Sequence, residues 1–137
     1  MDFKENSLDY ETYVSLRKSV EWNNFFEVQA RKALERCLYS LVVVDETKPI
    51  AMARMIGDGI YITIVDVVVS PQYQGKGIGK AMIEKLIQYV EATTPPGSRV
   101  SLQLLSEKGK EVFYEKLGFK RLPHEFCGPG MRKVIYT

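Results

Sequence analysis

An apolar run passes directly into a glycine-rich turn at Val67-Val68-Val69-Ser70-Pro71-Gln72-Tyr73-Gln74-Gly75-Lys76-Gly77-Ile78-Gly79-Lys80. The three valines favour a β-strand, and the apolar spacing after Gly77 predicts an amphipathic helix. Gly75, Gly77 and Gly79 carry no side chains that would keep a ligand from the main chain. Because the N–H groups at a helix N-terminus attract anions, this turn predicts a phosphate cradle.

Two better known glycine motifs do not fit the turn. A dinucleotide-binding fingerprint that starts at Gly75 needs glycine or alanine where the chain has Lys80. A Walker A loop needs a glycine where Gln74 stands and a hydroxyl where Ala81 stands. The turn is therefore a phosphate cradle of another kind.

Length and charge place bounds on the kind of protein. With 137 residues, the chain is long enough for one domain, which we expect to cover residues 1–137. Its 19 basic and 17 acidic residues nearly balance, so nothing indicates sequence-independent nucleic-acid binding. The apolar run from Ile60 to Val69 is too short to cross a bilayer, and the N-terminal residues do not resemble a secretory signal. We expect a cytoplasmic protein without nucleic-acid or membrane partners.

Cysteine and histidine are too few for a metal site. Cys37 and Cys127 lie far apart in the sequence and belong to no Cys-x-x-Cys motif, and His124 is the only histidine. We expect two free thiols and no bound metal.

Helix and strand patterns alternate along the chain. The expected helices cover residues 8–20, 26–37, 78–90 and a shorter stretch around 112–117; the expected strands cover residues 39–44, 50–56, 60–69, 100–105, 119–122 and 131–136. The strand-helix-strand crossover around 78–90 makes its two strands parallel within an otherwise antiparallel sheet. The order predicts an α/β (α+β) fold in which helices flank a mixed sheet.

Two motifs carry a family resemblance. The segment Gln74-Gly75-Lys76-Gly77-Ile78-Gly79 fits the pattern Gln/Arg-x-x-Gly-x-Gly/Ala, and a second block reads Phe113-Tyr114-Glu115-Lys116-Leu117-Gly118-Phe119. Both resemble landmarks of the GCN5-related N-acetyltransferases. The segment Leu16-Arg17-Lys18-Ser19-Val20-Glu21-Trp22 is similar to one in a subgroup that resembles the plastid arylalkylamine (serotonin) N-acetyltransferases.

The resemblance implies a fold, a co-substrate and a set of cofactor contacts. The strands on either side of the crossover would splay apart, and the pantetheine arm of acetyl-CoA would lie in the gap as a pseudo-strand. Homodimers are common in the family, so a homodimer is an expectation here as well. The implied cofactor-binding residues are Val67, Val68, Val69, Gln74, Gly75, Lys76, Gly77, Ile78, Gly79, Lys80, Phe113 and Lys116.

Tyr114 and Asp66 are the implied catalytic residues. Tyr114 occupies the family position of the proton donor to the departing thiolate; alternatively, its ring only packs beside Phe113. A carboxylate inside an apolar strand needs a reason, because burying an unpaired charge is costly. Asp66 would orient or deprotonate the acceptor amine; alternatively, backbone N–H groups or Arg54 satisfy it. Trp22 would be an aromatic platform for the acceptor, or else a buried core residue.

These features together predict an enzyme. We expect an N-acetyltransferase that moves acetyl from acetyl-CoA to a primary amine of a small molecule by direct attack in a ternary complex. One alternative is acetylation of a lysine or N-terminus of a protein. Another is a non-catalytic acetyl-CoA-binding module, against which Tyr114 and Asp66 argue, since a sensor needs neither.

Overall fold

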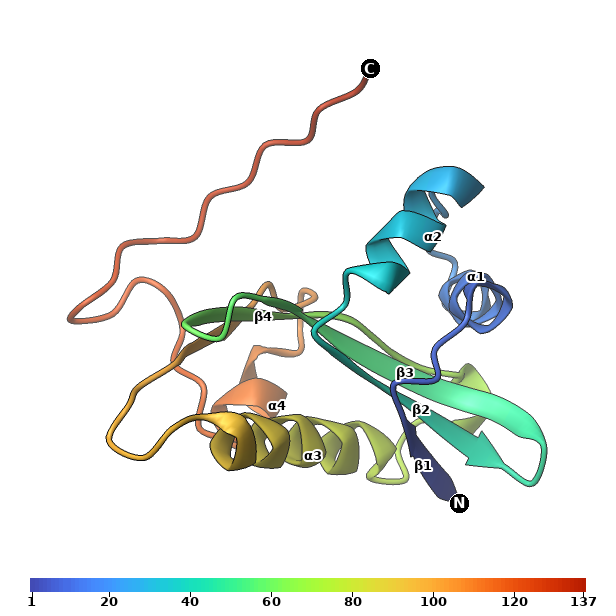
Figure 1. Ribbon diagram of the computed structural model, residues 1–137, viewed down its shortest axis with the longest axis horizontal. Coiled ribbons are helices and arrows are strands. Elements are labelled where there is room, and N and C mark those ends of the chain that lie inside the picture. Colours follow the sequence, from blue (N-terminus) through green and yellow to red (C-terminus); the bar gives the residue numbers. More distant parts are fainter. The chain divides into compact units, whose positions relative to one another are not determined.

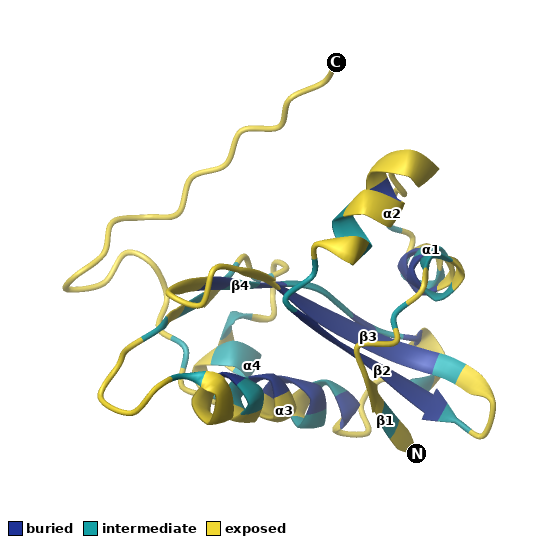
Figure 2. Ribbon diagram, in the orientation of Figure 1, coloured by how far each residue is buried: buried dark blue, intermediate teal, exposed yellow.

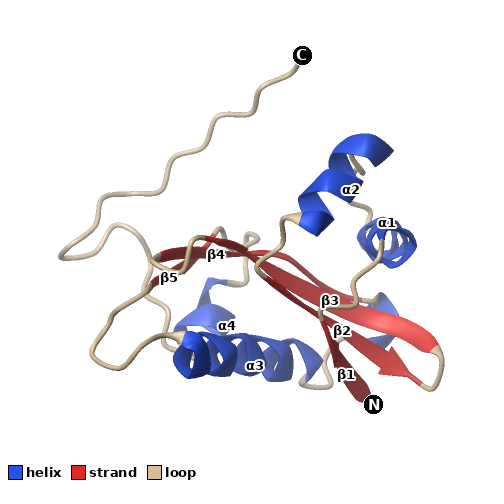
Figure 3. Cartoon of the chain, viewed as in Figure 1, coloured by secondary structure: helices blue, strands red, loops and turns tan.

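The computed structural model describes residues 1–137 as two compact units, residues 1–104 and 105–137. The first unit holds one five-stranded sheet, whose spatial order is the sequence order (Figure 3). Its strands are β1 (Asp2–Glu5), β2 (Tyr39–Asp45), β3 (Lys48–Gly57), β4 (Tyr61–Val69) and β5 (Ser101–Leu104). The first four strands pair antiparallel, and β5 runs parallel to β4. This confirms the predicted mixed sheet.

Helices cover both faces of this sheet. The helices α1 (Tyr10–Ser19) and α2 (Glu27–Glu35) lie on one face, and α3 (Ile78–Thr93) lies on the other (Figure 1). A capping side chain sets the start of α1, since Asp9 Oδ1 accepts a hydrogen bond of 2.9 Å from the Thr12 amide. The crossover through α3 makes β4 and β5 parallel, as the sequence predicted.

The buried residues form a layer on each side of the central strands (Figure 2). On the α1–α2 side, one cluster comprises Tyr13, Leu16, Ala30, Met52 and Val68. On the other side, α3 contributes Met82, Ile83 and Leu86, none of which is exposed. Because β3 is covered on both faces, its central residues are buried without alternation and, apart from Arg54, are apolar.

A β-bulge interrupts β4 at Asp66. Met52 of β3 pairs with Val68, but Arg54 pairs with Val65, so two residues of β4 stand opposite the single residue between them. Asp66 has φ +53°, a left-handed conformation that is uncommon for residues other than glycine. The bulge reverses the alternation of side chains along the rest of the strand. The sequence pattern did not predict it.

The pairing of β4 with β5 stops halfway along β4. It runs from Tyr61 opposite Ser101 to Ile64 opposite Leu104, so residues 65–69 have no β5 neighbour. The pairing therefore ends at the point where the predicted splay of the two parallel strands would begin. The unpaired edge begins at the bulge, which places the two irregular features of β4 side by side.

The second unit contains a single short helix, α4 (Glu111–Glu115). A turn follows in which His124 and Cys127 exchange backbone hydrogen bonds of 2.9 and 3.2 Å. The strands predicted at residues 119–122 and 131–136 were wrong, because these segments have no strand partner. Strand propensity alone does not make a strand without a hydrogen-bonded neighbour.

The first strand, β1, is a short strand at the edge of the sheet. The hydrophobic pattern of the sequence did not predict it, because its sequence Asp-Phe-Lys-Glu has only one apolar residue. None of the helices combines the length and the apolar character that crossing a bilayer would require.

Candidate functional site

The glycine turn joins the end of β4 to α3. A short 3-10 helix at Pro71–Tyr73 is followed by Gly75 at φ +77° and Gly77 at φ +81°, the N-cap of α3. The first helical hydrogen bond runs from the Ala81 amide to the Gly77 carbonyl, 3.1 Å, so the amides just before it have no acceptor inside the helix. An added Cβ at either glycine would have no atom within 4 Å. The backbone conformation is therefore what requires glycine here.

Side chains on both sides hold this turn in place. Gln74 Nε2 donates to the Val69 carbonyl at 2.9 Å, which ties the turn back to β4. The Tyr73 hydroxyl donates to Asp45 Oδ2 at 2.8 Å, a bond that raises the pKa of the phenol. The ammonium of Lys76 lies 5.3 Å from the Tyr73 ring centroid. The turn is thus anchored to the ends of two strands, which orders its amides before any anion arrives.

The backbone of β4 next to the turn has free polar groups on one side. The Ser70 amide donates to the Ile50 carbonyl at 2.8 Å, and the groups of successive residues point to alternate sides of a strand. Val67 and Val69 therefore direct their N–H and C=O groups toward the edge that β5 leaves open. Val68 pairs with Met52, and its side chain is buried in the core.

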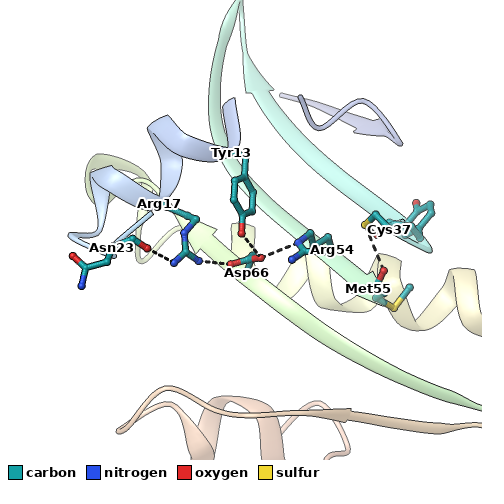
Figure 4. Close-up of polar contacts among 8 residues, drawn as sticks. Tyr13, Arg17, Asn23, Cys37, Arg54, Met55 and Asp66 are labelled. Carbon is teal, nitrogen blue, oxygen red and sulfur yellow. Dashed lines mark hydrogen bonds and ion pairs between the residues drawn. The ribbon is translucent and has the colours of Figure 1, made fainter. Parts of the chain in front are cut away.

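Three side chains donate to the carboxylate of Asp66 at the bulge (Figure 4). Arg17 Nη1 donates to Oδ1 at 2.5 Å; Arg54 Nε and the Tyr13 hydroxyl donate to Oδ2 at 2.8 and 3.1 Å. The side chains of the two arginines and of Asp66 are each about one-tenth exposed. Two guanidinium groups thus face one carboxylate, so the buried cluster carries an excess positive charge.

This arrangement bears on the two roles predicted for Asp66. The structure contains the predicted ion pair with Arg54 and adds two donors, Arg17 and Tyr13, that sequence reasoning missed. The only available signal was the position of Arg17 inside the Leu16–Trp22 segment. With both carboxylate oxygens engaged, the geometry favours an anchoring role for Asp66 over proton transfer.

Trp22 lies beside the same cluster. Its ring is half-buried and packs against the core cluster on the α1–α2 side. The guanidinium of Arg17 lies 5.3 Å from its ring centroid. These contacts correspond to the core role that the sequence left open for Trp22.

The second unit carries Tyr114 near the end of α4. At the end of α4, the Gly118 amide donates to the Glu115 carbonyl and the Phe119 amide donates to the Tyr114 carbonyl. Gly118 has φ +97°, the left-handed conformation predicted for a glycine that follows a helix. This turn brings the Phe119 ring into an edge-to-face contact with the Tyr114 ring at 5.9 Å between centroids, and the Phe113 ring makes a similar contact at 5.0 Å. Burial raises the pKa of the Tyr114 phenol, and the charge of Glu107 adds to the rise.

Tyr114 is protonated at neutral pH, the state that a proton donor needs, and its raised pKa extends that state to higher pH. Lys116, at the C-cap of α4, is exposed, consistent with either a solvated lysine or a contact to a ligand phosphate. Both cysteines are free thiols. No group of three or more potential metal-binding side chains is present.

The Tyr13–Asp66 bond predicts a specific sensitivity to alkali. Burial and the Asp66 carboxylate raise the pKa of Tyr13 above its ordinary 10.0. The protonated phenol therefore contributes its full stabilisation of the fold below about pH 10, and this contribution is lost as the pH rises through the pKa of the folded state. Between about pH 9 and about pH 11, the unfolding free energy of the wild type should fall by up to about 1.4 kcal/mol more than that of Tyr13→Phe. Urea unfolding measures the difference, with the exposed Tyr136→Phe as control. Equal losses in the wild type and Tyr13→Phe would contradict the role of this phenol.

Comparison with known proteins agrees with this geometry. The sequence model described as "Acetyltransferase (GNAT) domain" matches residues 36–121. Serotonin N-acetyltransferase 2 of Oryza sativa subsp. japonica is 39% identical over 110 residues, which cover 74% of this chain and 52% of that protein. The histone acetyltransferase TAP1 of Glycine max is 38% identical over 85 residues, covering 61% of this chain and 35% of that protein.

A solved structure extends the likeness to nearly the whole chain. A probable acetyltransferase from Staphylococcus aureus superposes with a TM-score of 0.81 at 26% identity, covering 98% of this chain and 100% of that one. The chain spans only about half or less of the length of the curated plant relatives it matches. The family match includes both the glycine turn and the Tyr114 block. The chain belongs to the GNAT family of acetyltransferases.

Proposed function

We propose that this chain is an N-acetyltransferase that moves the acetyl group of acetyl-CoA directly to a primary amine of a small molecule. The observation that carries the proposal is the ordered glycine turn at residues 75–77 next to the open edge of β4, in a chain of the GNAT family. The match to residues 36–121 crosses the division between the two units, which supports one acetyltransferase domain over residues 1–137.

The residues of the first unit fit the chemical parts of acetyl-CoA. The amides at the start of α3, with Gly75 and Gly77 in left-handed conformations, suit the pyrophosphate, and Lys76 and Lys80 add positive charge nearby. The N–H and C=O groups of Val67 and the N–H group of Val69 suit the amide-bearing pantetheine arm, which can pair with a strand edge; the Val69 carbonyl already accepts a hydrogen bond from Gln74. Phe113 and Lys116 are the proposed contacts from the second unit.

Acetyl-CoA supplies the acetyl group as a thioester. In the proposed reaction a neutral amine forms the new C–N bond, the C–S bond breaks, and the amine nitrogen loses a proton to solvent water. Tyr114 would donate its phenolic proton to the departing sulfur and recover one from solvent. The amide N–H groups along the open β4 edge would stabilise negative charge that develops on the acetyl oxygen. No covalent enzyme intermediate is needed.

A small-molecule acceptor is the first candidate because of the rice relative named for serotonin. An acceptor lysine or N-terminus on a protein is the second, and the soybean relative named as a histone acetyltransferase favours it. A panel of arylalkylamines, polyamines, amino sugars, amino acids and lysine peptides separates the two. Release of free CoA thiol serves as a common readout for every acceptor class.

The glycine turn yields a prediction that separates binding from folding. Gly77→Ala forces alanine into a left-handed conformation and should lower the unfolding free energy by about 1–2 kcal/mol. It should also weaken acetyl-CoA binding, measured by calorimetry, at least about tenfold. Gly59→Ala is the matched control, because Gly59 has φ +95° and open space around it but lies in the turn before β4. It should cost similar stability and leave acetyl-CoA affinity unchanged. Equal loss of affinity in both variants would contradict the proposed cradle.

Tyr114 yields a second prediction. Tyr114→Phe should keep acetyl-CoA affinity and lower kcat at least about tenfold, equivalent to about 1.4 kcal/mol of transition-state stabilisation. Tyr136→Phe removes the hydroxyl of an exposed tyrosine and should leave kcat unchanged. Turnover that is indifferent to Tyr114→Phe would overturn the proton-donor role. Tight acetyl-CoA binding without turnover of any amine would favour a binding module instead.

A further inference from the structure

The Arg17 side chain donates hydrogen bonds both to the β4 bulge and to the connection between α1 and α2. One terminal nitrogen, Nη1, donates to Asp66 Oδ1, and the other, Nη2, donates to the main-chain carbonyl of Asn23, each at 2.5 Å (Figure 4). The Arg17 side chain is about one-tenth exposed. A planar guanidinium can hold two acceptors in fixed directions, which a single ammonium cannot do. Arg17 thus sets the place of the connection relative to the bulge.

Aromatic rings on both sides of Asn23 reinforce this link. The Cζ atom of Arg17 lies 5.3 Å from the Trp22 ring centroid and 5.0 Å from that of Phe25. The Trp22 amide also donates to the Arg17 carbonyl at 3.0 Å. The side chain and the main chain of one residue therefore hold a connection that has no regular secondary structure of its own.

The connection presents apolar surface outward. Phe25 and Phe26 are 52% and 87% exposed, although both are large aromatic residues. The bulge to which Arg17 ties them marks the start of the open β4 edge, where the proposed function places the thioester arm. Apolar rings at a constant position beside that edge suit the non-reacting part of an amine substrate.

We propose that Arg17 is a positioning residue for the acceptor: it fixes residues 22–26 against the Asp66 bulge so that the exposed rings of Phe25 and Phe26 bind the apolar part of the amine. The inference rests on the proposed acetyltransferase function. Asp66 serves here as the anchor of Arg17 rather than as a base. Arg54 bonds the opposite oxygen of the same carboxylate and makes no bond to the connection, so it provides a matched control.

The first measurement needs no substrate and uses the full chain. Amide hydrogen exchange of residues 22–25 is compared in the wild type, Arg17→Lys and Arg54→Lys. Both variants keep their positive charge beside Asp66, but only Arg17→Lys loses the fork that spans Asp66 and Asn23. We expect exchange in this segment to accelerate at least about tenfold in Arg17→Lys and to stay within about twofold in Arg54→Lys. Unchanged exchange in Arg17→Lys, or equal acceleration in both variants, would overturn the inference.

The second measurement uses the amine that the acceptor panel identifies. Arg17→Lys should raise the KM for the amine at least about fivefold, while acetyl-CoA affinity stays within about twofold of the wild type. Arg54→Lys should raise the amine KM less. If Arg17→Lys does not fold, Phe25→Leu replaces it; this variant removes a half-exposed ring beside the guanidinium and should raise the amine KM in the same direction.

The two measurements distinguish a failure of the positioning role of Arg17 from a failure of the proposed acetyltransferase function. A loosened connection with an unchanged amine KM would refute the positioning role and leave the acetyltransferase function intact. A wild-type protein that acetylates no amine would refute the function, and the acceptor role of Arg17 would fall with it. In that case the exchange data would describe only the order of residues 22–26.

Discussion

The arrangement of the first unit depends on the hydrogen bonds and ion pairs that Tyr13, Arg17 and Arg54 make to the carboxylate of Asp66. It lies at a bulge with φ +53°, and three donors from α1 and β3 converge on it. Removing one partner of a buried ion pair costs about 3–5 kcal/mol, because the remaining charge is left uncompensated. The cluster thus fastens α1 to the sheet and stabilises a backbone conformation that an aspartate would otherwise avoid.

The bulge also explains how one strand serves two purposes. Before the bulge, β4 pairs on both sides and completes the sheet; after it, β5 has stopped pairing and one edge carries free N–H and C=O groups. The strand then leads into a glycine turn, and the first amides of α3 after it have no acceptor inside the helix. An open edge and an anion cradle therefore follow each other along the chain, which is the order in which an extended thioester arm and its pyrophosphate would need them.

The sequence predicted those parts of the fold that local patterns determine. The mixed sheet, the hairpins and the crossover helix depend on periodicity, and the left-handed conformation of Gly118 depends on the backbone freedom that glycine alone has. The partners of Asp66 could not be predicted fully, because Tyr13 and Arg17 lie 53 and 49 residues away in the sequence. The strand predicted at 131–136 was wrong for a related reason, since strand formation requires a partner that propensity does not specify.

The proposed function requires that the glycine turn and the open edge of β4 together bind acetyl-CoA. The most direct test is a titration of isotope-labelled protein with acetyl-CoA, followed by amide chemical shifts in two-dimensional nitrogen–proton spectra. We expect the largest changes at Val67, Val69 and residues 75–80, and little change in β1 at the opposite edge of the sheet. Saturable binding that leaves the amides of the turn and of β4 unshifted would contradict this requirement.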